Sequence, residues 1–271
     1  MTRDLRPRGA RPLDALVVAA LDWEAAAVRA GLAAVVAGPT PRTWRGRTAG
    51  GRDVLVAQLG VGRLHAAVAL AGLPAARVLA VVGCAGGLGP ALRAGDLVVA
   101  TEIVRLANGE RHACATAAVE RWAAATDLAV LAGAHAAADA VLADAAAKAA
   151  AGERAAALVA EMEGWAVVEA ARARGVPVVG LRAVLDEADE HVPLLAGAVD
   201  ETTGDLRVAA AARALAYRPW LWASAVRMAR RQRAAERALR EASAAGLLDA
   251  IVAAGLEAGP GVRTPGPAGG C

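Results

Sequence analysis

Short apolar runs recur along the first 190 residues, and each leads into a turn or a helix-forming segment. Residues 15–21 (ALVVAAL) precede the helical pattern of residues 23–34, and residues 54–59 (VLVAQL) end a hairpin whose turn is Gly50-Gly51. Runs this short suit buried strands, and strands that alternate with helices form α/β domains. The pattern therefore predicts an α/β fold in three layers, with a mixed central β-sheet between helices.

The alternation continues in the middle of the chain. Residues 77–104 predict a strand, a glycine-rich bend and a second strand, with the turn at residues 93–96. Residues 115–157 are Ala-rich and predict helix, interrupted by a strand near residues 128–133. A short strand, a helix ended by Gly175 and a buried strand follow, and the last of these ends at Asp186.

The 271 residues predict one domain with two tails. Residues 1–12 are Arg- and Pro-rich and predict a disordered basic tail. No linker divides the chain before residue 200, so residues 13–256 are expected to form a single domain with a helical extension from about residue 206. Residues 257–271 are rich in Gly and Pro and predict a second disordered tail.

Composition excludes several classes of protein. Hydrophobic residues make up 57% of the chain, which is ample for a packed core and excludes a disordered protein. The net charge is only +3, and the basic surplus lies at the ends and near residues 227–240. No nucleic-acid partner is therefore expected.

The three cysteines, Cys84, Cys114 and Cys271, show neither the spacing of metal ligands nor an even disulfide framework. Reduced thiols predict a cytoplasmic protein without a structural metal. The apolar run at 15–21 has no small-residue cleavage site, and no stretch is long and apolar enough for a confident transmembrane helix.

Two glycine-rich turns are candidate ligand sites. Residues 60–66 (GVGRLHA) lack the third glycine of a dinucleotide fingerprint, and the next strand ends without the acidic residue that holds a ribose. An NAD site is therefore not expected, and a tight turn is the alternative. Gly83, Gly86 and Gly87 follow a strand and clear its carboxyl end for a ligand, although a sharp bend explains them equally well.

Carboxylates stand at the ends of three apolar runs. Glu24 follows the first run, Glu161 and Glu163 open a helix, and Asp186 ends the last strand. The position of each carboxylate alone is explained by a favourable interaction with a helix dipole or by capping of a helix. Together, at one edge of a parallel sheet, they predict an acidic pocket.

These stretches resemble the nucleoside phosphorylase/nucleosidase superfamily, and within it the branch of methylthioadenosine/S-adenosylhomocysteine nucleosidases. Residues 83–100 (GCAGGLGPALRAGDLVVA) match its glycine-rich element and the strand that follows. Residues 160–167 (AEMEGWAV) and 182–189 (RAVLDEAD) match two further signatures, and Glu163 and Asp186 have the spacing of the family motif. The resemblance covers about residues 15 to 195.

Two features resemble one subgroup, the hopanoid-associated phosphorylases. Leu185 gives the "LDEAD" sequence an apolar residue where nucleosidases have Ser. Residues 199–230 are similar to the C-terminal extension of that subgroup. The subgroup implies adenosylhopane, a lipid-linked adenine nucleoside, as substrate; methylthioadenosine and S-adenosylhomocysteine are the alternatives, and a non-catalytic nucleoside-binding protein is a further one.

The resemblance implies cleavage of the N-glycosidic bond of a purine nucleoside. Asp186 matches the general acid that protonates the leaving base, and apolar neighbours such as Val184 and Leu185 are expected to raise its pKa. Glu24 matches the glutamate that orients or deprotonates the attacking water. The substrate-binding residues implied are Glu163 for the ribose hydroxyls, Met162 for the sugar face, and Glu161, Cys84, Ala85, Gly86 and Leu185 around them.

The sequence also departs from the family pattern. Cys84 stands where nucleosidases have Ser, and the chain has no Phe to stack on a purine. Val81 and Val82 occupy the place where purine nucleoside phosphorylases have an Arg, and Glu24 would repel phosphate. Hydrolysis is therefore expected over phosphorolysis, with water or phosphate as the co-substrate and no cofactor.

Two expectations concern partners. The resemblance implies a homodimer. The basic segment 218–240, with Trp220 and Trp222 near its start, has two interpretations: a helix on an anionic membrane surface, or a solvated helix that packs Leu221, Ala225 and Met228 on the core.

Overall fold

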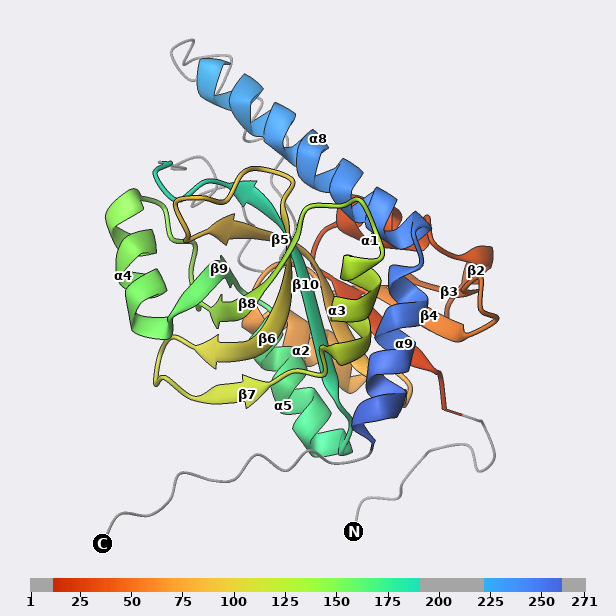
Figure 1. Ribbon diagram of the computed structural model, residues 1–271. Helices are drawn as coiled ribbons and strands as arrows, with labels where there is room; N and C mark the ends of the chain where they lie inside the picture. The colour runs from red at the N-terminus through yellow and green to blue at the C-terminus, as the bar shows by residue number, and fades with distance from the viewer. Residues whose placement is uncertain (1–11, 191–221, 260–271) are drawn as a thin grey trace, which may run out of the picture.

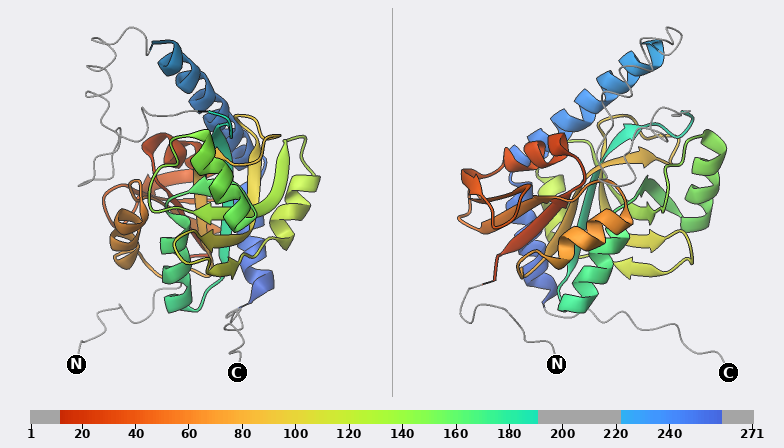
Figure 2. Two further views of the ribbon diagram at one scale, coloured as in Figure 1. Left: turned by 90° about the vertical axis from the view of Figure 1, so that its left-hand side faces the viewer. Right: turned by 180° about the vertical axis from the view of Figure 1, so that it is seen from behind.

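A computed structural model describes residues 12–190 and 222–259, in which a twisted mixed β-sheet lies between two layers of helices (Figures 1 and 2). The predicted α/β class with a mixed central sheet is confirmed. The strands are β1 (Ala15–Ala19), β2 (Ala33–Ala37), β3 (Thr43–Arg47), β4 (Asp53–Gln58), β5 (Leu79–Gly87), β6 (Leu97–Arg105), β7 (Arg111–Ala113), β8 (Val130–Ala137), β9 (Ala157–Glu161) and β10 (Val178–Asp186).

The helices are Ala-rich and cover both faces of the sheet. One core lies between the sheet and helices α1, α3, α8 and α9; the other lies beneath α2 and α5. The helices are α1 (Asp22–Arg29), α2 (Arg63–Ala71), α3 (Ala117–Ala124), α4 (Ala145–Ala155), α5 (Gly164–Arg174), α8 (Trp222–Ala244) and α9 (Leu247–Ala258).

The sheet closes on itself at one end. β10 pairs in parallel with β5 and antiparallel with β6, while β8 and β9 complete a ring of five strands. From β5 the sheet continues through β1, β4, β3 and β2. The parallel order of β1, β5 and β10 brings their carboxyl ends to one edge, which is where α/β proteins bind ligands.

Two predicted elements are wrong in part. The helix predicted over residues 23–34 ends at Arg29, and Ala33–Ala37 form an edge strand that pairs with β3. The predicted bend at Gly83–Gly87 is instead the end of β5, because β10 and β9 pair with it there. The chain turns only after Gly87.

The C-terminal helices agree with the predicted helical extension where they are described. α8 packs on α1 and β10, and its N-terminal half extends beyond the sheet (Figure 1). α9 runs to Ala258, so residues 257 and 258 are helical and not part of the predicted tail. Residues 1–11, 206–221 and 260–271, for which tails and the start of the extension were predicted, lie outside the described residues.

Candidate active site

A pocket with a cavity volume of about 130 Å³ opens at the edge where β1, β5 and β10 end. Aliphatic side chains line most of it, among them Val61, Leu88, Val141 and Leu142. The structure brings together every residue predicted for the site, since the lining includes Glu24, Cys84, Ala85, Gly86, Glu161, Met162, Glu163, Leu185 and Asp186.

Glu24 is held by backbone groups. It lies in the first turn of α1, directly after β1, and is 1% exposed. Oε2 accepts from the N–H groups of Ala20 and Leu21, each at 2.9 Å, and Oε1 accepts from Cys84 N at 2.7 Å. Glu24 thus caps its own helix and ties α1 to β5 through three backbone donors.

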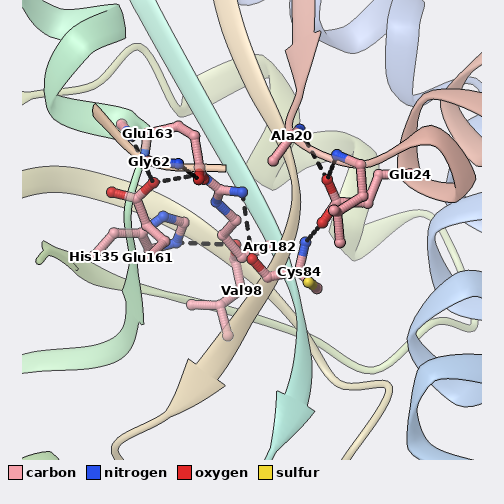
Figure 3. A network of polar contacts seen from close by, with 11 residues as sticks. Ala20, Glu24, Gly62, Cys84, Val98, His135, Glu161, Glu163 and Arg182 are labelled. Carbon is pink, nitrogen blue, oxygen red and sulfur yellow. Dashed lines mark hydrogen bonds and ion pairs between the residues drawn. The ribbon is translucent and has the colours of Figure 1, made fainter. Parts of the chain in front are cut away.

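Arg182 joins the two glutamates of the β9–α5 junction (Figure 3). Its Nη2 contacts Glu161 Oε2 and lies 3.1 Å from Glu163 Oε2, and Nη1 donates to Cys84 O at 3.3 Å. All three charged side chains are buried. A buried cation shared by two carboxylates compensates their desolvation, and it positions both glutamates relative to β5 and β10.

The two glutamates have different tasks in this arrangement. Glu161 accepts from the N–H groups of Glu163 at 3.0 Å and Gly164 at 2.6 Å, so it caps the start of α5. Glu163 Oε1 accepts from Gly62 N at 2.9 Å, which connects the start of α5 to the start of α2. Burial raises the pKa of both carboxyls, and the Arg182 charge opposes that shift.

Position 83 requires glycine, because the side chains of Arg182 and Glu24 meet there. A Cβ at this position would lie 2.8 Å from both Arg182 Nη1 and Glu24 Oε1. Neither side chain has room to move, because each is buried and hydrogen-bonded. The glycine predicted to clear space for a ligand therefore makes room for the polar network of the protein itself.

Cys84 is not a nucleophile in this pocket. Burial and the adjacent Glu24 carboxylate raise the pKa of its thiol well above the usual value. The thiolate is the reactive form of cysteine, so covalent catalysis through Cys84 is disfavoured. Its backbone N–H and C=O, rather than its sulfur, connect Glu24 to Arg182.

Asp186 has a different environment from the one predicted. It is 5% exposed, and Leu185 beside it is half-buried, as an apolar setting requires. However, Lys148 Nζ of α4 lies 2.5 Å from Asp186 Oδ2. The apolar setting expected from Val184 and Leu185 therefore also includes a buried ammonium in contact with the carboxyl.

Lys148 was not among the site residues predicted from the sequence. It lies in an Ala-rich helix in which nearly every face is apolar, so no periodicity pointed to the side chain that reaches the end of β10. The available signal was compositional, because the sequence contains no other lysine.

Three arginines whose charge could attract phosphate are engaged in other contacts. Arg45 pairs with Asp53, and Arg63 pairs with Asp139 at 3.2 Å. Arg182 lies behind the glutamates. Among the described residues, Lys148 is the one cationic side chain that lines the pocket.

Within residues 12–190 and 222–259, no helix is long and apolar enough to cross a membrane. No cluster of three or more His, Cys, Asp or Glu side chains in the same ranges has the arrangement of a metal site.

Solved structures of nucleosidases have a similar fold. The methylthioadenosine/S-adenosylhomocysteine nucleosidase of Colwellia psychrerythraea, in complex with adenine, is 18% identical with a TM-score of 0.65 over 90% of this chain and 96% of its own. The corresponding enzyme of Neisseria meningitidis, with methylthio-immucillin-A, is 22% identical with a TM-score of 0.62, covering 88% and 97%. Futalosine hydrolase of Helicobacter pylori is 18% identical with a TM-score of 0.62, covering 88% and 97%.

The family comparison covers most of the chain. No curated protein matches the sequence. The model of the phosphorylase superfamily matches residues 14–217, which include all the pocket-lining residues. The chain belongs to the phosphorylase superfamily.

Proposed function

We propose that the protein is an enzyme that hydrolyses the N-glycosidic bond of an adenine nucleoside and releases adenine. The observation that carries the proposal is the placement of three buried carboxyls, Glu24, Glu163 and Asp186, around one pocket. Family membership and the nucleosidase names of the similar structures support the same reaction class.

In the proposed reaction, one carboxyl acts on the base and the other two act on the sugar and the attacking water. Asp186 gives a proton to N7 of the base as the bond from C1′ to N9 breaks and its electron pair passes to the base. The negative charge of Glu163 stabilises the positive ribosyl group while its oxygens bind the ribose hydroxyls. Water held by Glu24 attacks C1′, and its proton passes to that carboxylate.

Water is the preferred nucleophile for an electrostatic reason. Glu24, Glu161 and Glu163 gather at the end of the pocket where the sugar is proposed to lie, and Arg182 is the cation shared among them. Three carboxylates against one buried cation disfavour the binding of phosphate there. Phosphorolysis is the alternative.

The proposed substrate is a lipid-linked adenine nucleoside of the adenosylhopane type. Its support is the aliphatic lining by Val61, Leu88, Val141 and Leu142, together with the subgroup features at Leu185. Methylthioadenosine and S-adenosylhomocysteine, named for the similar structures, are the alternative substrates. A nucleoside-binding protein without activity is the remaining alternative.

A peripheral membrane contact is proposed for α8. Arg230, Arg233 and Arg237 are exposed and lie along one side of the helix, and Trp222 and Val226 are 59% and 52% exposed at its start. Such a helix suits an anionic lipid surface. Sedimentation with anionic vesicles but not with neutral ones is the expected result.

A homodimer is proposed through α2. Leu64 and Val68 stand one turn apart on this helix and are 71% and 79% exposed. A second copy of the chain would cover this apolar face. Sedimentation velocity is expected to give twice the chain mass, and Leu64→Glu with Val68→Glu is expected to give the mass of one chain.

The decisive assay measures base release. The protein is incubated with methylthioadenosine, S-adenosylhomocysteine, adenosine and adenosylhopane, with and without phosphate, and adenine and the sugar product are quantified. Adenine with free sugar is the expected result. Absence of base from all four substrates would refute the enzyme, and ribose 1-phosphate as product would refute hydrolysis.

A further inference from the structure

The turn of residues 187–190, which directly follows Asp186, is built around Glu190. A backbone hydrogen bond closes the turn, since Glu190 N donates to Glu187 O at 3.1 Å. The Glu190 side chain closes it a second time, because its Oε2 accepts from Glu187 N at 3.1 Å. Asp186 is the last residue of β10, so the place of this turn also fixes the backbone on the far side of Asp186.

Three elements from different parts of the chain hold the turn. Lys148 Nζ of α4 donates to the backbone oxygens of Glu187 at 2.6 Å and Glu190 at 3.2 Å. Ala94 N, from the connection between β5 and β6, donates to Glu187 Oε1 at 3.4 Å. Arg231 of α8 forms an ion pair with Glu190 Oε2. One of the three supports is therefore the C-terminal helix.

The face of α8 that carries Arg231 is fixed against this end of the sheet. Further along the helix, Ala235 and Leu239 are fully buried in the core. Ala234, three residues after Arg231 and so on the same side of the helix, lies against Gly95, where a Cβ would be 3.4 Å from Ala234 Cβ. α8 thus contacts both the β5–β6 connection and the turn after Asp186.

The pair of Arg231 and Glu190 is partly shielded from solvent. The two side chains are 21% and 18% exposed, so salt screens their attraction less than that of an exposed pair. Within its described length, α8 contributes no side chain to the lining of the pocket. The proposed reaction gives neither Arg231 nor Glu190 a part, although both adjoin the segment that carries its acid.

We infer that Glu190 is a positioning residue for Asp186 and that Arg231 holds it in place, so that α8 completes the active site without lining it. The inference rests on the proposed function, which makes Asp186 the proton donor to the base. Arg231 acts through Glu190, and Glu190 acts through the turn. Proton transfer requires hydrogen-bond distance, so a displacement of about 1 Å is enough to slow the reaction.

Steady-state kinetics of base release tests this role, with the substrate from which the unmodified protein releases most adenine. For Arg231→Gln, which removes the ion pair, we expect kcat to fall about ten-fold and KM to change less than about two-fold, because the position of the acid matters in the transition state. Arg231→Lys keeps a cation and is expected to retain kcat within about three-fold.

The matched control is Arg240→Gln. It removes an arginine from an exposed pair with Glu236 on the same helix, and it should leave kcat and KM unchanged. Urea unfolding of both proteins gives the folded fraction under the assay conditions. A fall in kcat of Arg231→Gln that only follows its folded fraction would contradict a positioning role.

Glu190→Gln tests the route from α8 to the turn. Glutamine keeps an oxygen for Glu187 N but loses the charge that pairs with Arg231. We expect this variant to lower kcat about as much as Arg231→Gln, and the double variant to be no slower than either alone, because both changes break one pair. Two falls in kcat that multiply in the double variant would show that Arg231 does not act through Glu190, which would overturn the inference.

The outcomes separate the inference from the proposed function. Absence of base release by the unmodified protein would overturn the proposed function and this inference with it. Base release by the unmodified protein, together with equal kcat values for Arg231→Gln and Arg240→Gln, would overturn the inference alone and leave the proposed function standing. A raised KM with unchanged kcat in Arg231→Gln would also overturn it, because substrate binding and not the placement of the acid would then be affected.

Discussion

The two ends of the pocket hold buried carboxyls in different ways. At one end Glu24 is fixed by three backbone N–H groups, and Glu161 and Glu163 share Arg182. At the other end Asp186 faces Lys148 alone. The first end gathers three carboxyls around one arginine, whereas Asp186 pairs with a single lysine. The contrast is consistent with the proposed roles, in which the glutamates stabilise charge on the sugar and the aspartate gives a proton to the base.

The largest effect is expected from Asp186→Asn, which removes the proton donor and keeps the shape. We expect kcat for adenine release to fall about 10²–10⁴-fold, the usual contribution of a general acid, with adenine affinity changed only a few-fold. Asp189→Asn, at an exposed carboxyl three residues further on, serves as the control and should be active. Near-normal activity of the Asp186→Asn protein would end the assignment of this residue as the acid.

The second-largest effect is expected at the end of the pocket that holds Glu161 and Glu163. Arg182→Met leaves Glu161 and Glu163 buried without their cation, so we expect a loss of about 3–5 kcal/mol in the free energy of unfolding, measured in urea. Arg45→Met removes a cation from the partly exposed pair with Asp53 and should cost less than about 1 kcal/mol. Equal losses in the two proteins would contradict the structural role of Arg182.

The smallest effect concerns His135, which lies behind Arg182 (Figure 3). Its ring is fully buried with Nε2 3.1 Å from Val98 O, and burial, aided by the Arg182 charge, lowers the pKa of His135 from 6.5 to about 3. The unfolded chain therefore binds the proton first, and stability present above pH 6.5 is lost as the pH falls toward 3.

From this shift we expect His135 to account for a loss of about 2 kcal/mol in unfolding free energy between pH 7 and pH 5. His135→Leu should flatten the stability profile over that interval by about the same amount, whatever its stability at pH 7. Urea unfolding at a series of pH values provides the measurement. An identical slope in both proteins would show that His135 is already accessible to protons in the folded state.

Prediction from sequence was most successful where local signals coincide. Apolar runs identified β1, β4, β5 and β10, and Gly175 ends α5 in a left-handed conformation, as a C-terminal glycine signal predicts. β2 was missed because AAVVA is equally compatible with a helix. Its antiparallel pairing with the next strand, β3, decided the strand.

In the candidate site, too, the sequence identified some residues and the fold decided their contacts. Glu24, Glu163 and Asp186 carry family motifs and stand at strand ends, so the sequence pointed to them directly. Whether a carboxyl is held by backbone groups, an arginine or a lysine depends on which elements meet it. Cys84 N comes from β5 and Lys148 from α4, and neither has a local signal that links it to its partner.

The sequence by itself determined the alternation of strands and helices in most of the domain, the family and the carboxyls of the pocket, because each is encoded in hydrophobic periodicity or in a contiguous motif. Only the tertiary structure decided the charge environment of those carboxyls. Closure of the sheet through β10 brings Arg182 between two glutamates and sets Asp186 against the chain's only lysine. Electrostatic interactions depend on distance in space, and the sequence separation of two charges does not specify that distance.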